Sequence, residues 1–293
     1  MLISIIIPIG SFITDKRNIY RTLNECKHIE FEVLLIMDGA SYKEQKEISE
    51  YISENNLDNV SLLNSNSRNP GSARNIGLDK ANGDWIVFWD SDDIPMPEAL
   101  FQMILKNQEI NNDILVGQYE TIFLSSEEKN KRNTDLNSST HSVSDLILDP
   151  GIWRMAFRRN CISDSRFPNL SMAEDQVFLS KILISNKQIG FHNEIVYNYV
   201  KGGINQLTKN PAALKDLRNS LNLILDMFTA AKPSDKAFLK IFISKQFITL
   251  IKLGNLNLKF QAIHSIGRLP INSITSIILQ VMKISINLKP KRN

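Results

Sequence analysis

Three carboxylates follow the apolar run Trp85–Trp89, and their types and spacing are well suited to chemistry. Asp90, Asp92 and Asp93 lie within four positions. Charges at the end of a strand lose hydration and repel one another, so we expect a cation or a cationic ligand to offset them. Mg²⁺ and Mn²⁺ prefer oxygen ligands, and Mg²⁺ commonly takes one or two carboxylates together with substrate phosphates. The alternative is an acidic turn that caps a helix beginning near Pro97.

Apolar strand segments alternate with helical segments in the first half of the chain, which predicts an α/β fold with a mostly parallel sheet. The expected strands are Ile3–Pro8, Phe31–Met37, Val60–Leu63 and Asp84–Trp89, and the expected helices are Asn18–His28, Tyr42–Asn55 and Gly71–Lys80. Ligands of such sheets bind beyond the carboxyl ends of the strands. Because Asp38 and the aspartates at 90–93 follow two of these strands, we expect them to share one site.

The second half carries weaker signals. Residues Ser125–Ser144 are polar, which predicts a mobile surface loop. A helix is expected to open at Glu174 and Asp175, where negative charge also favours the helix dipole, so a purely structural role is an alternative for both residues. Ile195–Val200 reads as a last strand, and Gly202-Gly203 as a flexible turn.

Five motifs occur in an order that carries a family resemblance. They are Ile3–Pro8, Met37–Gly39, Asn69–Gly77, Asp90–Asp93 and the pair Glu174-Asp175. Over roughly residues 2–200 the chain resembles the family 2 glycosyltransferases of the bacterial surface-polysaccharide type. The resemblance implies a GT-A nucleotide-diphospho-sugar transferase fold with a Rossmann-like, mostly parallel sheet. It also implies transfer of a sugar from a nucleotide-sugar, with UDP as the expected nucleotide, to a glycan or lipid-linked glycan acceptor.

The resemblance assigns roles to individual residues of the sheet. It places the metal, Mn²⁺ or Mg²⁺, on Asp92 and Asp90. The alternative for Asp90 is a position next to the ribose or to a water on the metal, and Asp93 is expected to cap the next helix. A divalent ion would stabilise the charge that develops on the departing diphosphate. The residues implied in binding the nucleotide-sugar are Pro8, Ile9, Asp38, Arg74, Asp90 and Ser91. The alternative for Arg74 is a surface salt bridge.

The pair Glu174-Asp175 is where the resemblance places catalysis. Asp175 matches the general base that removes the proton of the acceptor hydroxyl as the hydroxyl attacks, and Glu174 shapes the site or is the alternative base. The resemblance further implies inversion at the anomeric carbon. Residues 1–205 would form the catalytic domain, with 1–95 as the nucleotide-sugar half and 96–205 as the acceptor half.

Some positions depart from the family pattern. Ile9-Gly10-Ser11 replaces an aromatic-Asn pair after the first strand, and Met37 replaces the first of two aspartates. The segment from Tyr197 contains no histidine, so Lys201 or water would serve the diphosphate, and His192 is expected to be structural.

Residues 206–293 form a predicted basic helical region. Ten Lys or Arg residues and no Asp or Glu lie between Lys236 and Asn293, whereas residues 1–235 contain 24 basic and 31 acidic side chains. An apolar stripe contains Ile274, Ile277, Ile278, Val281 and Met282. One interpretation is packing on the catalytic domain or on a second subunit in a homo-oligomer. The other is an amphipathic helix on an anionic membrane surface. No nucleic-acid-binding module is recognised.

The cysteine content indicates the compartment of the protein. Two cysteines in 293 residues are too few for a disulfide framework, so we expect a cytoplasmic protein, with peripheral attachment to the inner face of the plasma membrane as an alternative. A non-catalytic nucleotide-binding scaffold is one competing function. A second, an NAD-type oxidoreductase, would need a Gly-x-Gly-x-x-Gly turn after the first strand, which this sequence lacks.

Overall fold

The computed structural model describes residues 1–10, 16–123, 133–136, 140–184, 187–201 and 213–287. The chain divides into two compact units. The sheet unit contains Met1–His141, Gly151–Asn169 and Lys187–Gln206. The helical unit contains Ser142–Pro150, Leu170–Asn186 and Leu207–Asn293. The division of the chain at residue 205 stays a prediction. Each of the two compact units combines three separate segments of the chain, whereas that prediction used a single boundary.

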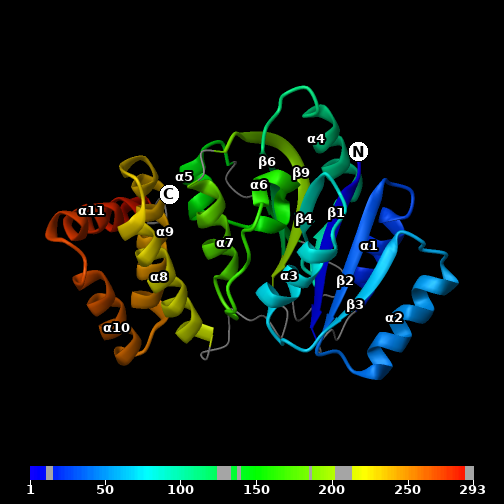
Figure 1. The fold of residues 1–293 in the computed structure, drawn as a ribbon, viewed down its shortest axis with the longest axis horizontal. Helices are drawn as coiled ribbons and strands as arrows, with labels where there is room; N and C mark the ends of the chain where they lie inside the picture. The colour runs from blue at the N-terminus through cyan, green and yellow to red at the C-terminus, as the bar shows by residue number, and fades with distance from the viewer. Residues whose placement is uncertain (11–15, 124–132, 137–139, 185–186, 202–212, 288–293) are drawn as a thin grey trace. The chain divides into compact units, whose positions relative to one another are not determined.

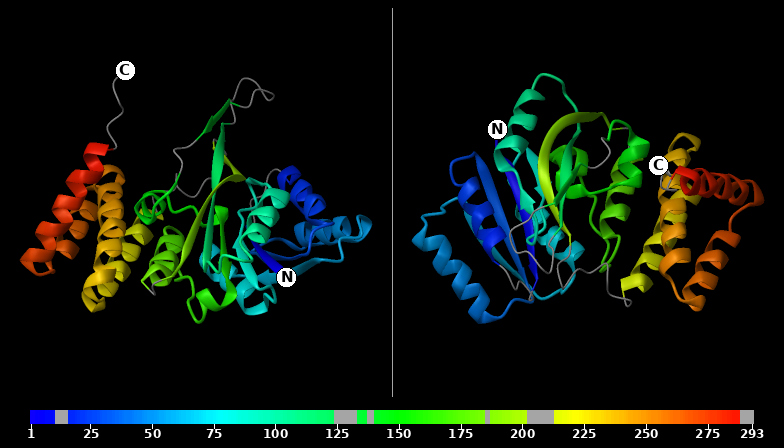
Figure 2. Two further views of the ribbon diagram at one scale, coloured as in Figure 1. Left: turned by 90° about the horizontal axis from the view of Figure 1, so that it is seen from above. Right: turned by 180° about the vertical axis from the view of Figure 1, so that it is seen from behind.

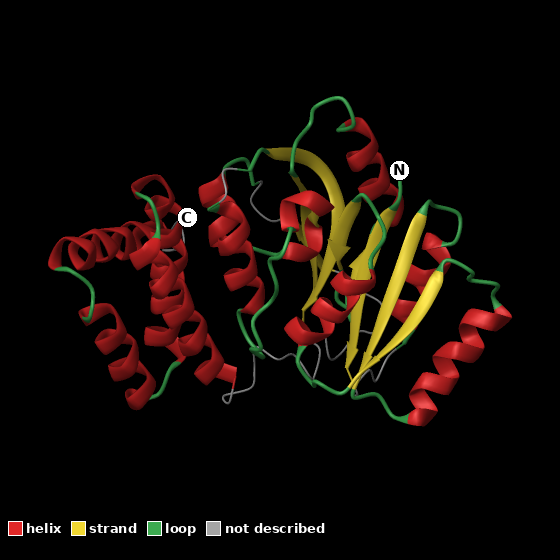
Figure 3. Ribbon diagram, viewed as in Figure 1, coloured by secondary structure: helices red, strands yellow, loops and turns green. Residues whose placement is uncertain are grey.

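The sheet unit is built on one sheet, whose strands are yellow in Figure 3. Its strand order is β3-β2-β1-β4-β8-β6-β9-β5, with β7 paired to β6. The strands are β1 (Ile3–Gly10), β2 (Phe31–Asp38), β3 (Val60–Ser65), β4 (Trp85–Phe88), β5 (Ile94–Pro95), β6 (Ile114–Phe123), β7 (Asn133–Leu136), β8 (Met155–Arg158) and β9 (Ile189–Lys201). Strands β1 to β4 are mutually parallel, as predicted. Their carboxyl ends therefore lie at one edge of the sheet.

Helices cover both faces of the parallel strands (Figure 1). They are α1 (Arg17–Cys26), α2 (Tyr42–Glu54), α3 (Pro70–Lys80), α4 (Pro97–Lys106) and the short α6 (Arg159–Ile162). Ile5 and Ile7 of β1 share a core with Ile19 and Leu23 of α1. Ile6, which points the other way, faces α3, where a Cβ on Gly77 would lie 2.4 Å from the Ile6 side chain. Alternate side chains of one buried strand thus pack on two helices, which explains the continuous apolar run.

Several elements differ from the sequence-based expectation. Strand β1 continues through Gly10, and β9 begins six residues before the predicted Ile195 because its first part pairs with β6. The segment expected to be a loop at 125–144 contains β7 and the start of α5, and its other residues up to 139 lie outside the described residues. Gly202 and Gly203 also lie outside them. Strand β8, which pairs antiparallel with β4 and β6, was not predicted.

The helical unit consists of α5 (Val143–Leu148), α7 (Glu174–Leu183), α8 (Ala213–Ala230), α9 (Pro233–Leu253), α10 (Leu256–Gly267) and α11 (Ile271–Asn287). Helices α8 and α9 run side by side (Figures 1 and 2). Leu239, Phe242 and Leu250 of α9 are fully buried, as is Ile277 of α11. Among the described residues, no helix has the length and apolar character needed to cross a membrane.

Candidate functional site

The strand ends place most of the predicted nucleotide-site residues at one edge of the sheet. Gly10 pairs with Asp38 in the β1–β2 register, and Asp90 lies two residues after the end of β4. Pro8 and Ile9 are strand residues, and Ile9 is buried in the core. The Ile9 side chain is therefore packed in the core and points away from any ligand at the strand ends. Gly10, the last residue of β1, is exposed, and a Cβ there would meet no atom of the described residues within 4 Å.

The Asp38 carboxylate organises the turn between β3 and α3. Its Oδ1 accepts hydrogen bonds from Ser65 Oγ (2.8 Å), Ser67 Oγ (3.0 Å) and the Arg68 amide (2.8 Å). Its Oδ2 accepts from the Asn69 amide at 2.7 Å. The side chain is buried. Four donors of the protein thus fix Asp38, and the motif alone did not identify the two serines as its partners.

The same turn begins α3 and so places Arg74. Asn69 caps the helix by accepting a hydrogen bond from the Ser72 amide at 3.0 Å, and Pro70 occupies the first helical turn. One turn later, Arg74 is buried and its Nη2 lies 2.8 Å from Asp90 Oδ1. The alternative of a surface salt bridge is therefore wrong in its location, because the ion pair involves a buried arginine, and the predicted contact of Arg74 with the nucleotide-sugar stays a prediction.

A second contact holds Arg74 from the other side. Its guanidinium carbon lies 5.5 Å from the centre of the Phe167 ring, within cation–π distance. The neighbouring Asn75 fixes the backbone of Phe167, because its Oδ1 accepts from the Phe167 amide and its Nδ2 donates to the Phe167 carbonyl, both at 2.9 Å. Phe167 was missed in the sequence, since no motif links it to a residue more than ninety positions earlier.

The three aspartates after β4 point into different surroundings. Asp93 is buried, and its carboxylate accepts from Tyr197 Oη (3.0 Å) and the Val200 amide (2.7 Å) of β9. Burial, together with the charges of Asp90 and Asp92, raises the pKa of Asp93 well above its usual value. The expectation that Asp93 caps the next helix is wrong, because α4 begins at Pro97 after Met96 without a side-chain cap.

Asp92 and Asp90 remain the two accessible carboxylates of the turn. Asp92 is exposed, whereas Asp90 and Ser91 are half-buried. The pKa of Asp92 is raised to about 6 by its dense surroundings and by the nearby charge of Asp90. Two like charges this close form a natural binding site for a cation.

An aromatic cluster supports the turn from β9. Tyr197 Oη also accepts a hydrogen bond from the Asp90 amide at 3.2 Å, so one hydroxyl joins both ends of the turn. The Trp153 ring stacks on Tyr197 at 4.5 Å and on Tyr199 at 5.6 Å between ring centres. Lys201, proposed to serve the diphosphate, is exposed, with Nζ 5.6 Å from the centre of the Tyr199 ring.

Glu174 and Asp175 open α7 of the helical unit. Glu174 is buried and Asp175 is half-buried, so Asp175 is the more accessible of the two carboxylates. Asp175 Oδ1 accepts from the Gln176 amide at 2.8 Å, a bond typical of the first turn of a helix. Ala173, the residue before Glu174, has a left-handed backbone conformation with φ of 61°.

A metal ion would have to complete its coordination from outside this turn. Among the described residues, no group of three or more His, Cys, Asp or Glu side chains is placed to hold one. Mg²⁺ and Mn²⁺ are commonly bound by one or two carboxylates plus substrate phosphates and water, which is the donor set that Asp90 and Asp92 offer. The residues therefore fit a metal that enters together with a phosphate-containing ligand.

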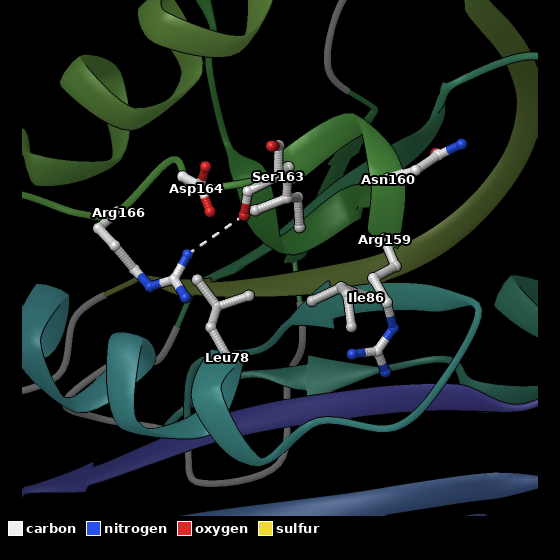
Figure 4. A pocket seen from close by; sticks show the side chains of 8 residues that line it. Leu78, Ile86, Arg159, Asn160, Ser163, Asp164 and Arg166 are labelled. Atoms are coloured by element: carbon white, nitrogen blue, oxygen red, sulfur yellow. Dashed lines mark hydrogen bonds between the residues drawn. The ribbon is translucent and has the colours of Figure 1, made fainter.

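A cavity of about 330 Å³ lies elsewhere in the sheet unit (Figure 4). Leu78, Ile86, Arg159 and Arg166 contribute to its lining, and none of the predicted site residues does. Arg166 pairs with Asp79 at 2.8 Å and donates to the Ser163 carbonyl, while Arg159 Nε donates to the Gly83 carbonyl. These arginines have structural roles at the opposite end of β4 from the aspartates.

Comparison with known proteins identifies relatives of this arrangement. The family model described as "Glycosyl transferase family 2" matches residues 4–161, which include Asp38, Arg74, Asp90 and Asp92. Poly(ribitol-phosphate) beta-N-acetylglucosaminyltransferase TarS of Staphylococcus aureus is 29% identical over 180 residues. That match covers 58% of this chain but 30% of TarS. An uncharacterised glycosyltransferase of Haemophilus influenzae is 28% identical over 214 residues, covering 71% of this chain and 82% of its own.

Solved structures share the fold. A crystal structure of S. aureus TarS 1–349 in complex with UDP-GlcNAc superimposes with a TM-score of 0.72 at 19% identity, covering 97% of this chain and 89% of that one. A mannosyltransferase of Pyrobaculum calidifontis, in complex with GDP-Man and Mn²⁺, gives a TM-score of 0.51 at 13% identity, covering 99% and 88%. The fold predicted from the sequence, an α/β GT-A fold with C-terminal helices, is confirmed.

Proposed function

Because the chain belongs to glycosyl transferase family 2, we propose that it is an inverting, metal-dependent glycosyltransferase that uses a UDP-linked sugar. The observation that carries this proposal is the turn after β4. There Asp90 and Asp92 stay accessible, while Asp93 is turned inward and Arg74 contacts Asp90 from α3. A divalent ion held by these two carboxylates, at the carboxyl edge of a parallel sheet, would be placed to bind the diphosphate of a donor.

The residues at this edge would contact different parts of the donor. Asp92 would hold the divalent ion with Asp90, and the ion when bound supplies Lewis-acid stabilisation of the departing diphosphate. Arg74 keeps Asp90 oriented and adds positive charge beside it. The Asp38-centred turn presents Ser67 and Arg68 beside Asp38, whose register partner is Gly10 at the end of β1, and we propose that the nucleoside binds there.

Asp175 is the proposed general base. It would take the proton of the acceptor hydroxyl as that hydroxyl attacks the anomeric carbon, and attack opposite the leaving diphosphate inverts this centre. Its greater exposure supports Asp175 over Glu174.

The relatives guide the choice of substrates. TarS was solved with UDP-GlcNAc, and its name assigns it a poly(ribitol-phosphate) acceptor. We propose a UDP-linked N-acetylhexosamine or hexose as the donor. The acceptor would be a hydroxyl of a cell-surface polymer or of its lipid-linked precursor.

A donor panel tests this function. UDP-, GDP- and dTDP-sugars are incubated with the full chain in Mn²⁺, Mg²⁺ or EDTA, and release of the nucleoside diphosphate is measured with and without a polyol-phosphate polymer. We expect release from a UDP-sugar that requires the metal. Stabilisation by UDP and Mn²⁺ without release from any sugar would instead support the non-catalytic scaffold. The family assignment argues against the oxidoreductase.

The C-terminal helices favour a membrane surface as a further partner. The inner face of α11 packs within the helical unit, with Ile277 and Ile284 buried. Its outer face exposes Ile271, Ile278 and Met282 at helical spacing, and α10 exposes Leu256 (75%), Phe260 (70%) and Ile263. The predicted stripe at 274–282 is therefore split between an inner and an outer face. Exposed apolar side chains in a segment with ten basic and no acidic residues match an anionic lipid surface.

Vesicle sedimentation tests this attachment. The full chain should sediment with phosphatidylglycerol vesicles at low salt and much less with phosphatidylcholine. Phe260→Ser combined with Ile278→Ser should reduce binding, whereas Tyr42→Ser, which changes an exposed aromatic residue of the sheet unit, should not. Failure of the unmodified chain to sediment would contradict the proposal. Dimerisation lost in the double variant would assign this surface to a second copy.

A further inference from the structure

The backbone just before Glu174 has an unfavourable conformation for its residue type. Ala173 has φ of 61° and ψ of 20°, in the left-handed region that non-glycine residues seldom adopt. It is also buried. Such a conformation persists only where the surrounding structure holds it, and it sets the direction in which the following side chains leave the helix start.

Side chains of α8 and α9, which follow Ala173 by 40 or more residues, form hydrogen bonds that fix its backbone. Ser220 of α8 is fully buried, and its hydroxyl donates to the Ala173 carbonyl at 3.3 Å. Gln246 of α9, also buried, donates from Nε2 to Ser220 Oγ at 2.7 Å. The same Nε2 lies 3.3 Å from Gln176 Oε1, in the first turn of α7. The Ser220–Gln246 pair thus contacts residues on both sides of Glu174 and Asp175.

A third contact fixes the chain that leads into Ala173. Asp216 lies one turn before Ser220 on α8, and its Oδ2 accepts a hydrogen bond from the Ser171 amide at 2.9 Å. Asn219 donates to the other oxygen of Asp216 at 3.3 Å. Residues 171, 173 and 176 are therefore each bonded to a side chain of α8 or α9, so the start of α7 has little freedom to rotate.

We propose that the Ser220–Gln246 pair is a positioning element for Asp175, which makes the C-terminal helices part of the catalytic apparatus. The pair fixes the left-handed turn at Ala173, and the turn fixes the direction of the Asp175 side chain. A general base must lie within hydrogen-bond reach of the proton that it removes, so a small rotation of α7 would impair it. This inference rests on the proposed role of Asp175 as the base.

The test compares two buried serines of the same unit. Ser220→Ala removes the donor to Ala173. Ser244→Ala is the matched control, because Ser244 of α9 is equally buried and its hydroxyl has no hydrogen-bond partner among the described residues. Both variants are checked for folding by circular dichroism and assayed well below their melting temperatures. Hydrogen exchange of peptides from the start of α7 should rise in Ser220→Ala and stay unchanged in Ser244→Ala.

Turnover then separates positioning from stability. With the best donor of the panel, Ser220→Ala should lower kcat by about tenfold or more while leaving the donor KM nearly unchanged. Ser244→Ala should match the unmodified chain. In an Asp175→Asn background, Ser220→Ala should lower the residual turnover no further, because the group that it positions is gone.

The outcomes distinguish this inference from the function on which it rests. Unchanged exchange at α7, normal kcat in Ser220→Ala, or an additive loss in the double variant would each overturn the positioning role. Full turnover of Asp175→Asn would instead overturn the assignment of the base.

Discussion

At the scale of the residue, three adjacent aspartates have different environments although they are chemically identical. The two bonds from β9 turn Asp93 inward, the Arg74 guanidinium pairs with Asp90, and Asp92 is left exposed. Neighbouring positions in a turn point in different directions, so each carboxylate meets its own set of partners. This division explains how the turn can be anchored to the sheet and still present carboxylates to a ligand.

Asp92→Asn tests the proposed metal ligand. The substitution keeps the size of the side chain and removes its charge, so the fold should be retained while Mn²⁺-dependent binding of UDP is lost. Calorimetric titration with UDP, with and without Mn²⁺, measures the effect. Affinity that Mn²⁺ still enhances as strongly as in the unmodified chain would remove Asp92 from the metal site.

Tyr197→Phe tests the anchor of the turn. The hydroxyl donates to buried Asp93 and accepts from the part-buried Asp90 amide, so its loss leaves both groups without this partner. We expect the free energy of unfolding to fall by about 1–3 kcal/mol. Urea denaturation measures it, with Tyr42→Phe as the control because Tyr42 is 81% exposed. Equal stability of the two variants would show that the hydroxyl does not support the turn.

At the scale of the element, the close approach of α3 to β1 is what brings Arg74 to the strand ends. Gly77 lies against Ile6 with no room for a Cβ, since the nearest Ile6 atom would be 2.4 Å away. A larger residue would push α3 outward and draw Arg74 away from Asp90. Glycine is thus required here by packing, although it weakens a helix relative to alanine.

Gly77→Ala should destabilise the protein in spite of the better helix propensity of alanine. Overpacking of this kind costs about 1–3 kcal/mol, which exceeds the roughly 1 kcal/mol that alanine contributes to a helix. The matched control is Gly267→Ala in α10, where a Cβ would meet no atom within 4 Å in the part of the chain that the structure describes. Thermal unfolding should show a lower Tm for Gly77→Ala and an equal or higher Tm for Gly267→Ala. A reversed order would mean that α3 can shift without cost.

At the scale of the whole molecule, both cysteines belong to the sheet unit and both are buried. Burial raises the pKa of the Cys26 thiol well above its usual range and raises that of Cys161 to about 12. The reactive species is the thiolate, so a raised pKa and poor access both suppress reaction at neutral pH.

Thiol labelling therefore reports on unfolding of the sheet unit. At pH 8 the native chain should react with an aromatic disulfide reagent far more slowly than a small-molecule thiol, and two thiols per chain should react at once in denaturant. Single Cys→Ser variants assign each reaction. Rapid reaction of either thiol in native buffer would show that this part of the core opens without global unfolding.

The sequence by itself determined the order and type of most elements. Strands β1, β2 and β4 were visible because a strand buried on both faces must be apolar throughout, and α1 to α3 because helices show their own local spacing. The position of the aspartates at the strand ends followed from the same pattern. Strand β8 and the early start of β9 were not visible, since short half-buried strands depend on their partners for definition.

Only the tertiary structure decided what individual site residues do. Ser65 and Ser67 bind an aspartate almost thirty positions away, Tyr197 binds one more than a hundred positions away, and Ser220 holds Ala173. Local patterns report which face of an element is apolar, and they contain no information about which distant donor meets a given carboxylate. That choice is made when the elements pack, because buried polar groups must find partners wherever the fold places them.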